Sequence, residues 1–347
     1  MQKVALIGTG FIAVEKHLPA WQKTRRMARV VALCDVDLQR AKQIAQRFGI
    51  PKVYSEFRAL LEAENPDLID ICTPPATHAS LALQAIERGA HVLIEKPMAV
   101  SISECDAILA AAREKNRKVC VVHSDLFYPA FIKARELVRR GIIGDFRGMR
   151  IFLSTPADYM TSRPNHWAHR LPGGVIGETG PHVVYLTLAF INPVQQVRVH
   201  AQKLLPEFPW SRFEDYRLEL IGEKAVSSIT LVYTTRQWGA QVEIWGSEGA
   251  LKLDLESQTL VRYRRGHLTH FAVALSGLSE AAQIVECLFR TGVDVLTQRF
   301  QNTHALLIRQ YLESMRNGAE PPVTAQEGRE AVRVMSLIVE QLERQTV

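Results

Sequence analysis

Short apolar runs alternate with amphipathic stretches through the first third of the chain. The apolar runs lie at residues 1–7, 30–34, 52–54, 67–73, 91–94 and 119–122. Between them, apolar residues recur at helical spacing, most clearly over 56–64, 76–88 and 101–115. Regular alternation of strand and helix is typical of a parallel, doubly wound α/β sheet. We therefore expect a first domain of this class over residues 1–123.

The pattern changes after residue 123. A helix is expected over 129–140, and alternating strand patterns then recur at 147–154, 197–203, 217–221, 227–234, 241–245, 250–255 and 260–264. Gly246-Ser247-Glu248-Gly249 has the composition of a hairpin turn between two of these strands. Helices at 302–315 and 326–345 complete the chain. We expect a second, α+β domain over residues 124–347, with an open, mostly antiparallel sheet.

Alternating apolar side chains in this second sheet suggest self-association. Val242, Ile244, Leu251 and Leu253 would all point to one face of the sheet. If that face is open, it needs a partner. The expected assembly is a homo-oligomer, a dimer or a tetramer.

A glycine-rich turn directly follows the first apolar run. Gly8-Thr9-Gly10-Phe11-Ile12-Ala13 has the spacing G-x-G-x-x-A, and Asp35 ends the second run. Gly8 permits a tight turn, Gly10 lets a pyrophosphate approach the backbone at a helix N-terminus, and Ala13 allows close packing. Asp35 can accept hydrogen bonds from ribose hydroxyl groups, and it disfavours a 2′-phosphate. The motif predicts binding of NAD in preference to NADP.

Two polar segments follow later strands of the first domain, at the edge where open α/β sheets bind ligands. Glu95-Lys96-Pro97 places a lysine there that can donate to a substrate hydroxyl oxygen and favour its deprotonation. A surface lysine held by an ion pair is the alternative. Thr73-Pro74-Pro75-Ala76-Thr77-His78 offers the cofactor a hydroxyl and an amide from Thr73, or is an ordinary turn capped by Thr77.

The densest polar cluster lies in the second domain, over residues 165–185. Glu178 and His182 follow Gly173-Gly174 and are four residues apart, which on a helix means one face and about 6 Å along the axis. A carboxylate so placed can orient an imidazole and raise its pKa, as a general base near neutral pH requires.

Three other roles stay open in this cluster. Glu178 and His182 could be a capping carboxylate with a core histidine. His166, His169, Glu178 and His182 could bind a metal, although H-x-x-H is not a zinc-protease spacing. Trp167 could stack on a sugar ring or simply pack.

Composition excludes several classes of function. The 347 residues are 47% hydrophobic and 22% charged, as in ordinary soluble proteins. The net charge of +6 comes from dispersed basic residues, so no nucleic-acid partner is expected. No run approaches the roughly 20 apolar residues of a membrane span, and no signal peptide is evident. With five scattered cysteines, never as C-x-x-C, we expect a cytoplasmic protein with reduced thiols.

These motifs, taken in order, resemble the glucose-fructose oxidoreductase/inositol dehydrogenase (Gfo/Idh/MocA) family. The resemblance rests on the G-x-G-x-x-A turn, Asp35, Thr73-Pro74-Pro75, Glu95-Lys96-Pro97 and the Gly-Gly…Glu-x-x-x-His block. It implies an NAD(P)-dependent enzyme for sugars, polyols or related alcohols, with Lys96 and His182 near the reacting carbon. The family commonly has aspartate where Glu178 stands, and a second aspartate at the position of Tyr185.

The motifs and the resemblance together assign residues to three groups. The expected catalytic residues are Lys96, His182 and Glu178. The expected cofactor contacts are Gly8, Thr9, Gly10, Phe11, Ile12, Asp35, Thr73, Pro74, Pro75, His78, Glu95 and Lys96. The expected substrate contacts are His123, Tyr128, Asn165, His166, Trp167 and His182, and no metal is expected.

The main functional hypothesis is an NAD-dependent sugar or polyol oxidoreductase. Two alternatives are an NAD-recycling lyase or glycosidase, and a regulator that binds NAD without turnover. Net NADH formation separates the oxidoreductase from the NAD-recycling lyase or glycosidase, which accumulates none.

Overall fold

The chain folds into two compact units. The computed structural model describes residues 1–264, 266–297 and 302–345. One unit comprises residues 1–127 and 301–333, and the other comprises 128–300 and 334–347. The expected boundary at residue 123 lies close to the observed one. The expectation that every later residue belongs to the second domain is wrong for 301–333, which fold with the first.

The first unit contains a six-stranded parallel sheet, as the alternation predicts. Its strands are β1 (Gln2–Ile7), β2 (Ala28–Cys34), β3 (Lys52–Tyr54), β4 (Leu68–Ile71), β5 (His91–Glu95) and β6 (Val119–Val122). They are ordered β3-β2-β1-β4-β5-β6, and every neighbouring pair is parallel. The chain order reverses beside β1, and open sheets of this kind bind ligands at such a reversal.

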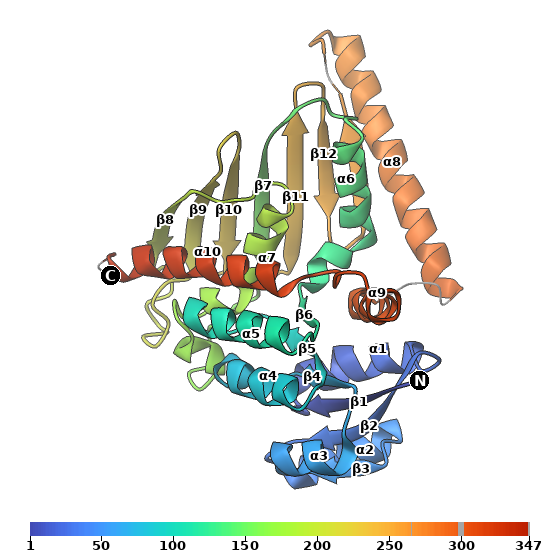
Figure 1. The fold of residues 1–347 in the computed structure, drawn as a ribbon. Coiled ribbons are helices and arrows are strands. Elements are labelled where there is room, and N and C mark those ends of the chain that lie inside the picture. Colours follow the sequence, from blue (N-terminus) through green and yellow to red (C-terminus); the bar gives the residue numbers. More distant parts are fainter. Residues whose placement is uncertain (265, 298–301, 346–347) are drawn as a thin grey trace. The chain divides into compact units, whose positions relative to one another are not determined.

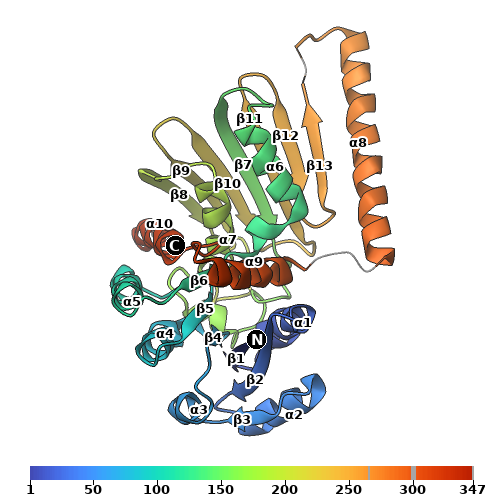
Figure 2. The ribbon, with the colours of Figure 1, turned by 45° about the vertical axis from the view of Figure 1, so that its right-hand side comes forward.

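Helices cover both faces of this sheet (Figure 2). The helix after β1 starts at Phe11, contains a π-helical turn, η1 (Ala13–His17), and continues as α1 (Leu18–Lys23). The others are α2 (Leu38–Phe48), α3 (Phe57–Glu64), α4 (His78–Glu87) after the 3₁₀ turn η2 (Pro75–Thr77), α5 (Ile102–Glu114), the 3₁₀ turn η3 (Ser124–Phe127) and α9 (Thr303–Asn317). The buried Tyr311 hydroxyl of α9 donates to the carbonyl oxygens of Val92 and Lys118, at 3.0 and 2.8 Å. This contact explains why a late segment belongs to the first unit.

The second unit contains a seven-stranded, mostly antiparallel sheet (Figure 1). Its strands are β7 (Phe146–Ser154), β8 (Gln196–Gln202), β9 (Asp215–Ile221), β10 (Val226–Val232), β11 (Gly239–Gly246), β12 (Ala250–Asp254) and β13 (Thr259–Tyr263), in the order β13-β12-β11-β7-β10-β9-β8. Among the described strands of this sheet, only β7 and β10 pair in parallel. The expected hairpin joins β11 to β12, where the Gly246 amide donates to the Gly249 carbonyl oxygen at 2.9 Å.

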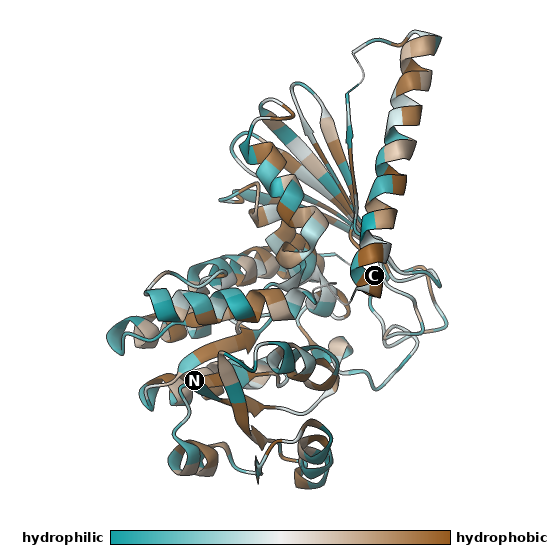
Figure 3. Ribbon diagram, turned by 90° about the vertical axis from the view of Figure 1, so that its right-hand side faces the viewer, coloured by the Kyte–Doolittle hydropathy of each residue, from teal (hydrophilic) through white to brown (hydrophobic). Residues whose placement is uncertain are grey.

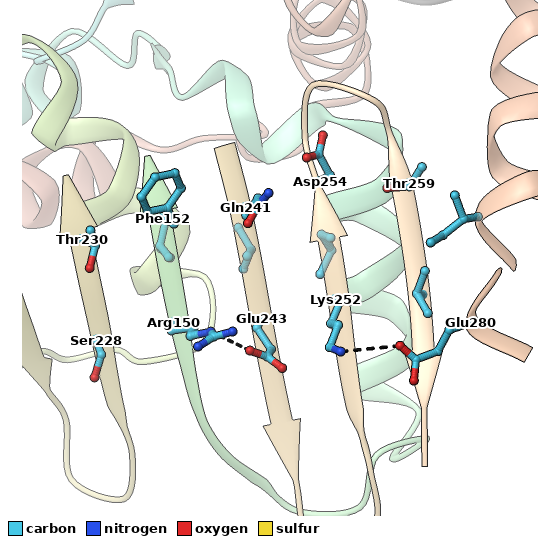
Figure 4. A pocket seen from close by; sticks show the side chains of 15 residues that line it. Arg150, Phe152, Ser228, Thr230, Gln241, Glu243, Lys252, Asp254, Thr259 and Glu280 are labelled. Carbon is cyan, nitrogen blue, oxygen red and sulfur yellow. Dashed lines mark ion pairs between the residues drawn. The ribbon is translucent and has the colours of Figure 1, made fainter. Parts of the chain in front are cut away.

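Helices α6 (Pro129–Arg139) and α7 (Ile176–Leu188) pack on this second sheet, and the 3₁₀ turn η4 (Trp167–Arg170) precedes α7. Val242, Ile244, Leu251 and Leu253 are all buried within the unit, at most 3% exposed. The expectation that these side chains form an open apolar face is therefore wrong. The opposite face carries mostly polar side chains, with Phe152 among them (Figure 4). Two ion pairs lie on it, Arg150–Glu243 at 2.6 Å and Lys252–Glu280 at 3.5 Å.

Glutamine side chains occupy both edges of the second sheet. At β8, the Gln341 and Gln345 side-chain oxygens, from the end of α10 (Ala325–Glu343) and just beyond it, accept from the Val199 and Ala201 amides at 3.0 and 3.1 Å. At β13, Gln283 accepts from the Arg262 amide at 3.0 Å and donates to its carbonyl oxygen at 2.9 Å. Such contacts satisfy the groups that would otherwise pair with another strand.

Gln283 belongs to α8 (His270–Leu296), a long helix that the sequence pattern did not predict. It runs beside β13 (Figures 1 and 2), and apolar residues recur along it (Figure 3). None of its residues is buried. By length and composition alone it could cross a membrane. The expectation that no segment of the chain is long and apolar enough to span a membrane is therefore wrong for α8.

Candidate active site

The turn after β1 is shaped as a dinucleotide-binding site requires. Gly8 has φ +89°, and a Cβ atom there would lie 2.8 Å from the Cys72 carbonyl oxygen, so only glycine fits. A Cβ on Gly10 would meet no atom within 4 Å, so the space beside Gly10 is open. A helix begins directly after it, at Phe11. The residues present therefore fit a pyrophosphate beside Gly10 and the helix N-terminus.

Asp35 joins the end of β2 to this turn. Its Oδ2 accepts from the Thr9 amide and from the Thr9 hydroxyl, both at 2.7 Å. Its Oδ1 accepts from the Asp37 amide at 2.9 Å and from the Arg40 guanidinium at 2.8 Å. Burial alone would raise the pKa of Asp35, but these hydrogen bonds outweigh it and hold the pKa below its usual value. Asp35 is thus an ionised carboxylate, and the amide and hydroxyl of Thr9 both donate to it. The expected contact of Thr9 with the cofactor stays a prediction.

His78 links the loops after β4 and β5. Its Nε2 lies 2.8 Å from the Thr73 carbonyl oxygen, and its Nδ1 lies 2.8 Å from that of Pro97. The ring is fully buried, and burial lowers its pKa. Because both ring nitrogens contact main-chain oxygens, the His78 ring links the two loops, and its expected contact with the cofactor stays a prediction. The Thr77 hydroxyl donates to the Thr73 hydroxyl at 2.7 Å, so the loop after β4 is also tied internally.

The carboxylate of Glu95 points into the first unit, although we expected it to contact the cofactor. Its Oε1 lies 2.8 Å from Nε2 of His17, and its Oε2 accepts from the Lys96 amide at 3.1 Å. His304 lies on the same carboxylate, with Nε2 at 3.7 Å from Oε1. Glu95 therefore anchors the main chain that carries Lys96. Its carboxylate is engaged within the first unit, and the expected contact between Glu95 and the cofactor stays a prediction.

His17 connects Glu95 to a second buried carboxylate. Its Nδ1 lies 2.8 Å from Oδ2 of Asp70, which also accepts from the Trp21 indole at 2.7 Å. Burial opposes a charge on His17, but Asp70 outweighs it, so the pKa of His17 is raised well above its usual value. Burial would likewise raise the pKa of Glu95, yet hydrogen bonds from His17 and His304 hold it well below its usual value. A buried imidazolium thus lies between two carboxylates.

Among the described residues, the groups with metal-ligand geometry are His17–Asp70–Cys72 and His17–Glu95–His304. Neither includes His166, His169, Glu178 or His182. A tetrahedral zinc ion keeps its donor atoms about 3.4 Å apart. The 2.8 Å separations at His17 are instead those of charge-assisted hydrogen bonds, so a proton and not a metal fits between these atoms.

In the second unit, α7 carries His182 as predicted. Nδ1 of His182 lies 2.7 Å from the Tyr185 hydroxyl, one turn further along the helix, and Tyr185 is 2% exposed. This partner was missed because the sequence interpretation treated Tyr185 only as the absence of a carboxylate. Its position three residues after His182 was the available signal. A base role for Nε2 requires the proton on Nδ1, which then donates to the Tyr185 oxygen.

Glu178 lies in the first turn of α7, where the helix dipole favours a carboxylate. The charge of Glu178 affects His166. Burial and the neighbouring His169 lower the pKa of His166, and the negative charge of Glu178 opposes that shift. His169 has a structural role, because its Nε2 lies 3.2 and 3.1 Å from the carbonyl oxygens of Met160 and Arg163. The predicted Glu178–His182 pairing stays a prediction.

An aromatic surface surrounds His166. Its ring stacks on Trp167 with centroids 5.6 Å apart, and the centroid of the Tyr159 ring lies 6.4 Å away. Tyr159 in turn contacts Trp238 at 5.0 Å. Trp167 and Trp238 are 43% and 57% exposed, so both offer ring faces for stacking on a sugar. Nothing in the local sequence pattern links Trp238 to this cluster.

The remaining predicted residues divide between the units. Asn165 is exposed and Tyr128 is partly exposed in the second unit, whereas His123 is buried in the first. Phe11 and Ile12 lie at the start of the helix after β1, and Phe11 is 67% exposed. Lys96 belongs to the first unit and His182 to the second, so their predicted meeting at one reacting carbon stays a prediction.

Comparison with known proteins identifies both halves of the chain. Residues 2–123 match a model described as an oxidoreductase family with an NAD-binding Rossmann fold, and residues 131–252 match the GFO/IDH/MocA C-terminal domain. D-apiose dehydrogenase of Paraburkholderia graminis is 26% identical over 343 residues, which cover 97% of this chain and 85% of that protein. Levoglucosan dehydrogenase of Pseudarthrobacter phenanthrenivorans is 25% identical over 276 residues, covering 76% and 65%.

Among solved structures, the WlbA dehydrogenase of Bordetella pertussis, in complex with NADH and UDP-GlcNAcA, has a similar fold. Its TM-score is 0.81 at 18% identity, and the match covers 99% of this chain and 95% of that one.

Proposed function

The chain belongs to the Gfo/Idh/MocA family of oxidoreductases, and from that premise we propose that it is an NAD-dependent dehydrogenase of a sugar or polyol hydroxyl group. The observation that carries the substrate class is the similarity to D-apiose dehydrogenase along nearly the whole chain. The open space beside Gly10, the ionised Asp35 and the exposed rings of Trp167 and Trp238 are consistent with a dinucleotide and a sugar.

NAD, when bound, supplies the hydride acceptor. His182 takes the proton of the substrate hydroxyl at Nε2, while Nδ1–H donates to Tyr185. Lys96 donates a hydrogen bond to the same substrate oxygen and stabilises the negative charge that develops there. Glu95, held by His17, positions the main chain at Lys96. Glu178 holds His166 or a neighbouring substrate hydroxyl.

The test is a screen of sugars, polyols and sugar acids for NADH formation by the purified protein. Absorbance at the NADH wavelength should rise in proportion to substrate consumed. An NAD-recycling lyase or glycosidase would convert its substrate with no net NADH, and a regulator would bind NAD without converting any of them. Either result would overturn the proposal.

We also propose that the protein is a cytoplasmic homo-oligomer. Four of its five free cysteines are buried and Cys287 is partly exposed, which suits a reducing compartment. Self-association can no longer be argued from Val242 and its neighbours, since these are buried within the unit. The apolar side chains of α8 are exposed instead, and they support self-association.

A further inference from the structure

Helix α8 has its polar side toward the protein and its apolar side toward solvent. The partly buried residues on α8 are Ala272, Ser276, Glu280, Gln283, Cys287 and Thr291, all small or polar. Gln283 bonds the main chain of Arg262, Glu280 pairs with Lys252 at 3.5 Å, and the Cys287 thiol lies 3.6 Å from the Leu260 carbonyl oxygen. These contacts set the rotation of the helix about its axis.

The large apolar residues consequently point away from the sheet. Phe271, Leu278, Phe289 and Leu296 are 75%, 68%, 72% and 85% exposed. A surface helix of a protein that works alone has the opposite arrangement, with its apolar stripe toward the core. The exposed stripe therefore requires a partner outside the described unit.

The spacing of this stripe is that of a coiled-coil seam. Its members alternate at intervals of four and three residues along the whole helix, and every one is exposed: Phe271, Leu275, Leu278, Ala282, Val285, Phe289, Gly292 and Leu296. Two helices with this repeat can pack knobs into holes along their whole length. We call these eight residues the α8 seam.

We propose that the α8 seam is covered by the α8 seam of a second copy of this chain, with the two helices antiparallel. In that orientation one register pairs all eight positions. Phe271 of one copy faces Leu296 of the other, and Leu278 faces Phe289. Leu275 faces Gly292, and Ala282 faces Val285, so a small residue lies opposite a larger one in each of these layers. The inference deepens the proposed self-association and does not depend on the substrate.

The exposed area supports a second copy. The large side chains of the seam expose roughly 700 Å² of apolar surface per copy, against about 800 Å² per partner in a stable interface of standard size. Such a stripe also exceeds the largest apolar patch of a typical monomer, about 300–600 Å². No charged residue lies in the seam, so the pairing leaves no buried charge without a partner.

A membrane is the competing occupant, since α8 is long and apolar enough to span one. A spanning helix would have to leave the sheet edge and break the Gln283 and Glu280 contacts. A helix lying on an anionic membrane surface needs lysine and arginine on its polar side. The helix carries only Arg290 against three carboxylates, Glu280, Glu286 and Asp294. These features favour a second copy.

The first experiment measures mass by light scattering for wild type, Leu278→Glu/Phe289→Glu, and the control Val273→Glu. The control adds a carboxylate to the same helix outside the seam. Wild type and the control should have the mass of two or more chains of 39.0 kDa. The seam variant should have a lower mass, that of a monomer if wild type is a dimer and that of a smaller oligomer if wild type is a tetramer. NADH affinity and far-UV circular dichroism should stay unchanged in all three.

Three results would overturn the inference. A monomeric wild type would contradict both the pairing of the α8 seam and the proposed self-association. A seam variant that keeps the wild-type mass would contradict only the role of the α8 seam. Cosedimentation of monomeric wild type with phosphatidylcholine/phosphatidylglycerol vesicles would assign α8 to a membrane.

A second experiment tests orientation without disrupting the seam. In a Cys287→Ser background, Ala282→Cys/Val285→Cys should form a disulfide-linked dimer on mild oxidation. Leu278→Cys alone should not, because two copies of residue 278 lie about 16 Å apart along antiparallel helices. Ready crosslinking of Leu278→Cys would show parallel helices and overturn the antiparallel pairing.

Discussion

The Tyr185 hydroxyl oxygen lies 2.7 Å from Nδ1 of His182, one helical turn away, and the Tyr185 side chain is almost completely buried. A phenol thus stands where the family resemblance implies a carboxylate. It can accept the Nδ1 proton and hold the ring with Nε2 available as a base. It stabilises the imidazolium less than a carboxylate would, because hydrogen bonds to charged acceptors are the stronger ones.

Tyr185→Phe should therefore lower kcat/KM about three- to tenfold, the value of one hydrogen bond of about 1 kcal/mol. NADH affinity should not change. Steady-state kinetics across pH provides the check, because the loss should be accompanied by a shift of the limb governed by His182. Wild-type kinetics and an unchanged pH profile would mean that Tyr185 only packs.

Lys96→Ala and His182→Ala should each lower kcat by about 10²–10⁴-fold, the usual contribution of a positioned acid or base. NAD affinity should survive in both. The double variant should lose less than the product of the two single losses, because both groups act on one oxygen and its proton. Glu178→Gln should lower kcat less than His182→Ala does. If His182→Ala keeps the wild-type kcat, the histidine is structural.

Asp35 should give at least a tenfold preference for NADH over NADPH, about 1.4 kcal/mol. The expected cause is repulsion of the 2′-phosphate by an ionised carboxylate. Arg40 already contacts Asp35 and is half exposed, so Arg40→Ala should weaken the residual NADPH binding. Fluorescence titration with both nucleotides measures this. Tighter binding of NADPH than of NADH by wild type would contradict it.

His17→Gln should destabilise the protein by about 3–5 kcal/mol, because it leaves two buried carboxylates without their cation. The pKa of His17 is raised on folding, so its contribution is fully present below its unfolded pKa of about 6.5. It is lost as pH rises through the higher folded pKa. For Glu95, whose pKa is lowered, the contribution is lost as pH falls through the folded value.

Thermal unfolding at several pH values should therefore show a gap between wild type and His17→Gln that narrows above pH about 6.5. The exposed His200→Gln serves as the control and should show no such dependence. A gap that widens with pH would mean that His17 is neutral in the folded protein.

Turnover should not require a metal ion. His17 is separated from its carboxylate partners by hydrogen-bond distances, and the metal-ligand groups of the described residues leave out His182. Activity should persist after prolonged dialysis against a chelator. Loss of activity that one divalent ion restores would return His166, His169, Glu178 and His182 to consideration as ligands.

Several features of the site could be read from neighbouring residues in the sequence. Gly8 is required by the turn itself, Gly10 leaves open space beside it, and Asp35 directly follows the neighbouring strand. The alternation of strand and helix sufficed for the parallel sheet because each unit of that pattern is local. His182 was predicted on a helix by its spacing from Glu178, and α7 carries both residues.

The direction of a side chain could not be read in the same way. Glu95 was expected to face the cofactor, but His17, Asp70 and His304, distant in sequence, draw its carboxylate inward. The four apolar residues of β11 and β12 were correctly placed on one face of the sheet. Whether that face was covered depended on α6 and α7, which come from elsewhere in the chain.

The sequence by itself determined the order of strands and helices in the first domain, the nucleotide-binding turn and the family, because these depend on local spacing and on the chemistry of individual residues. Tertiary structure decided that residues 301–333 join the first unit, that His17 is a buried cation, and that α8 turns its apolar side outward. The physical reason is that burial, ion pairing and helix rotation depend on groups brought together from distant parts of the chain. The main-chain bonds of Gln283 to Arg262, 21 residues away, show this most simply, since they orient the whole α8 seam.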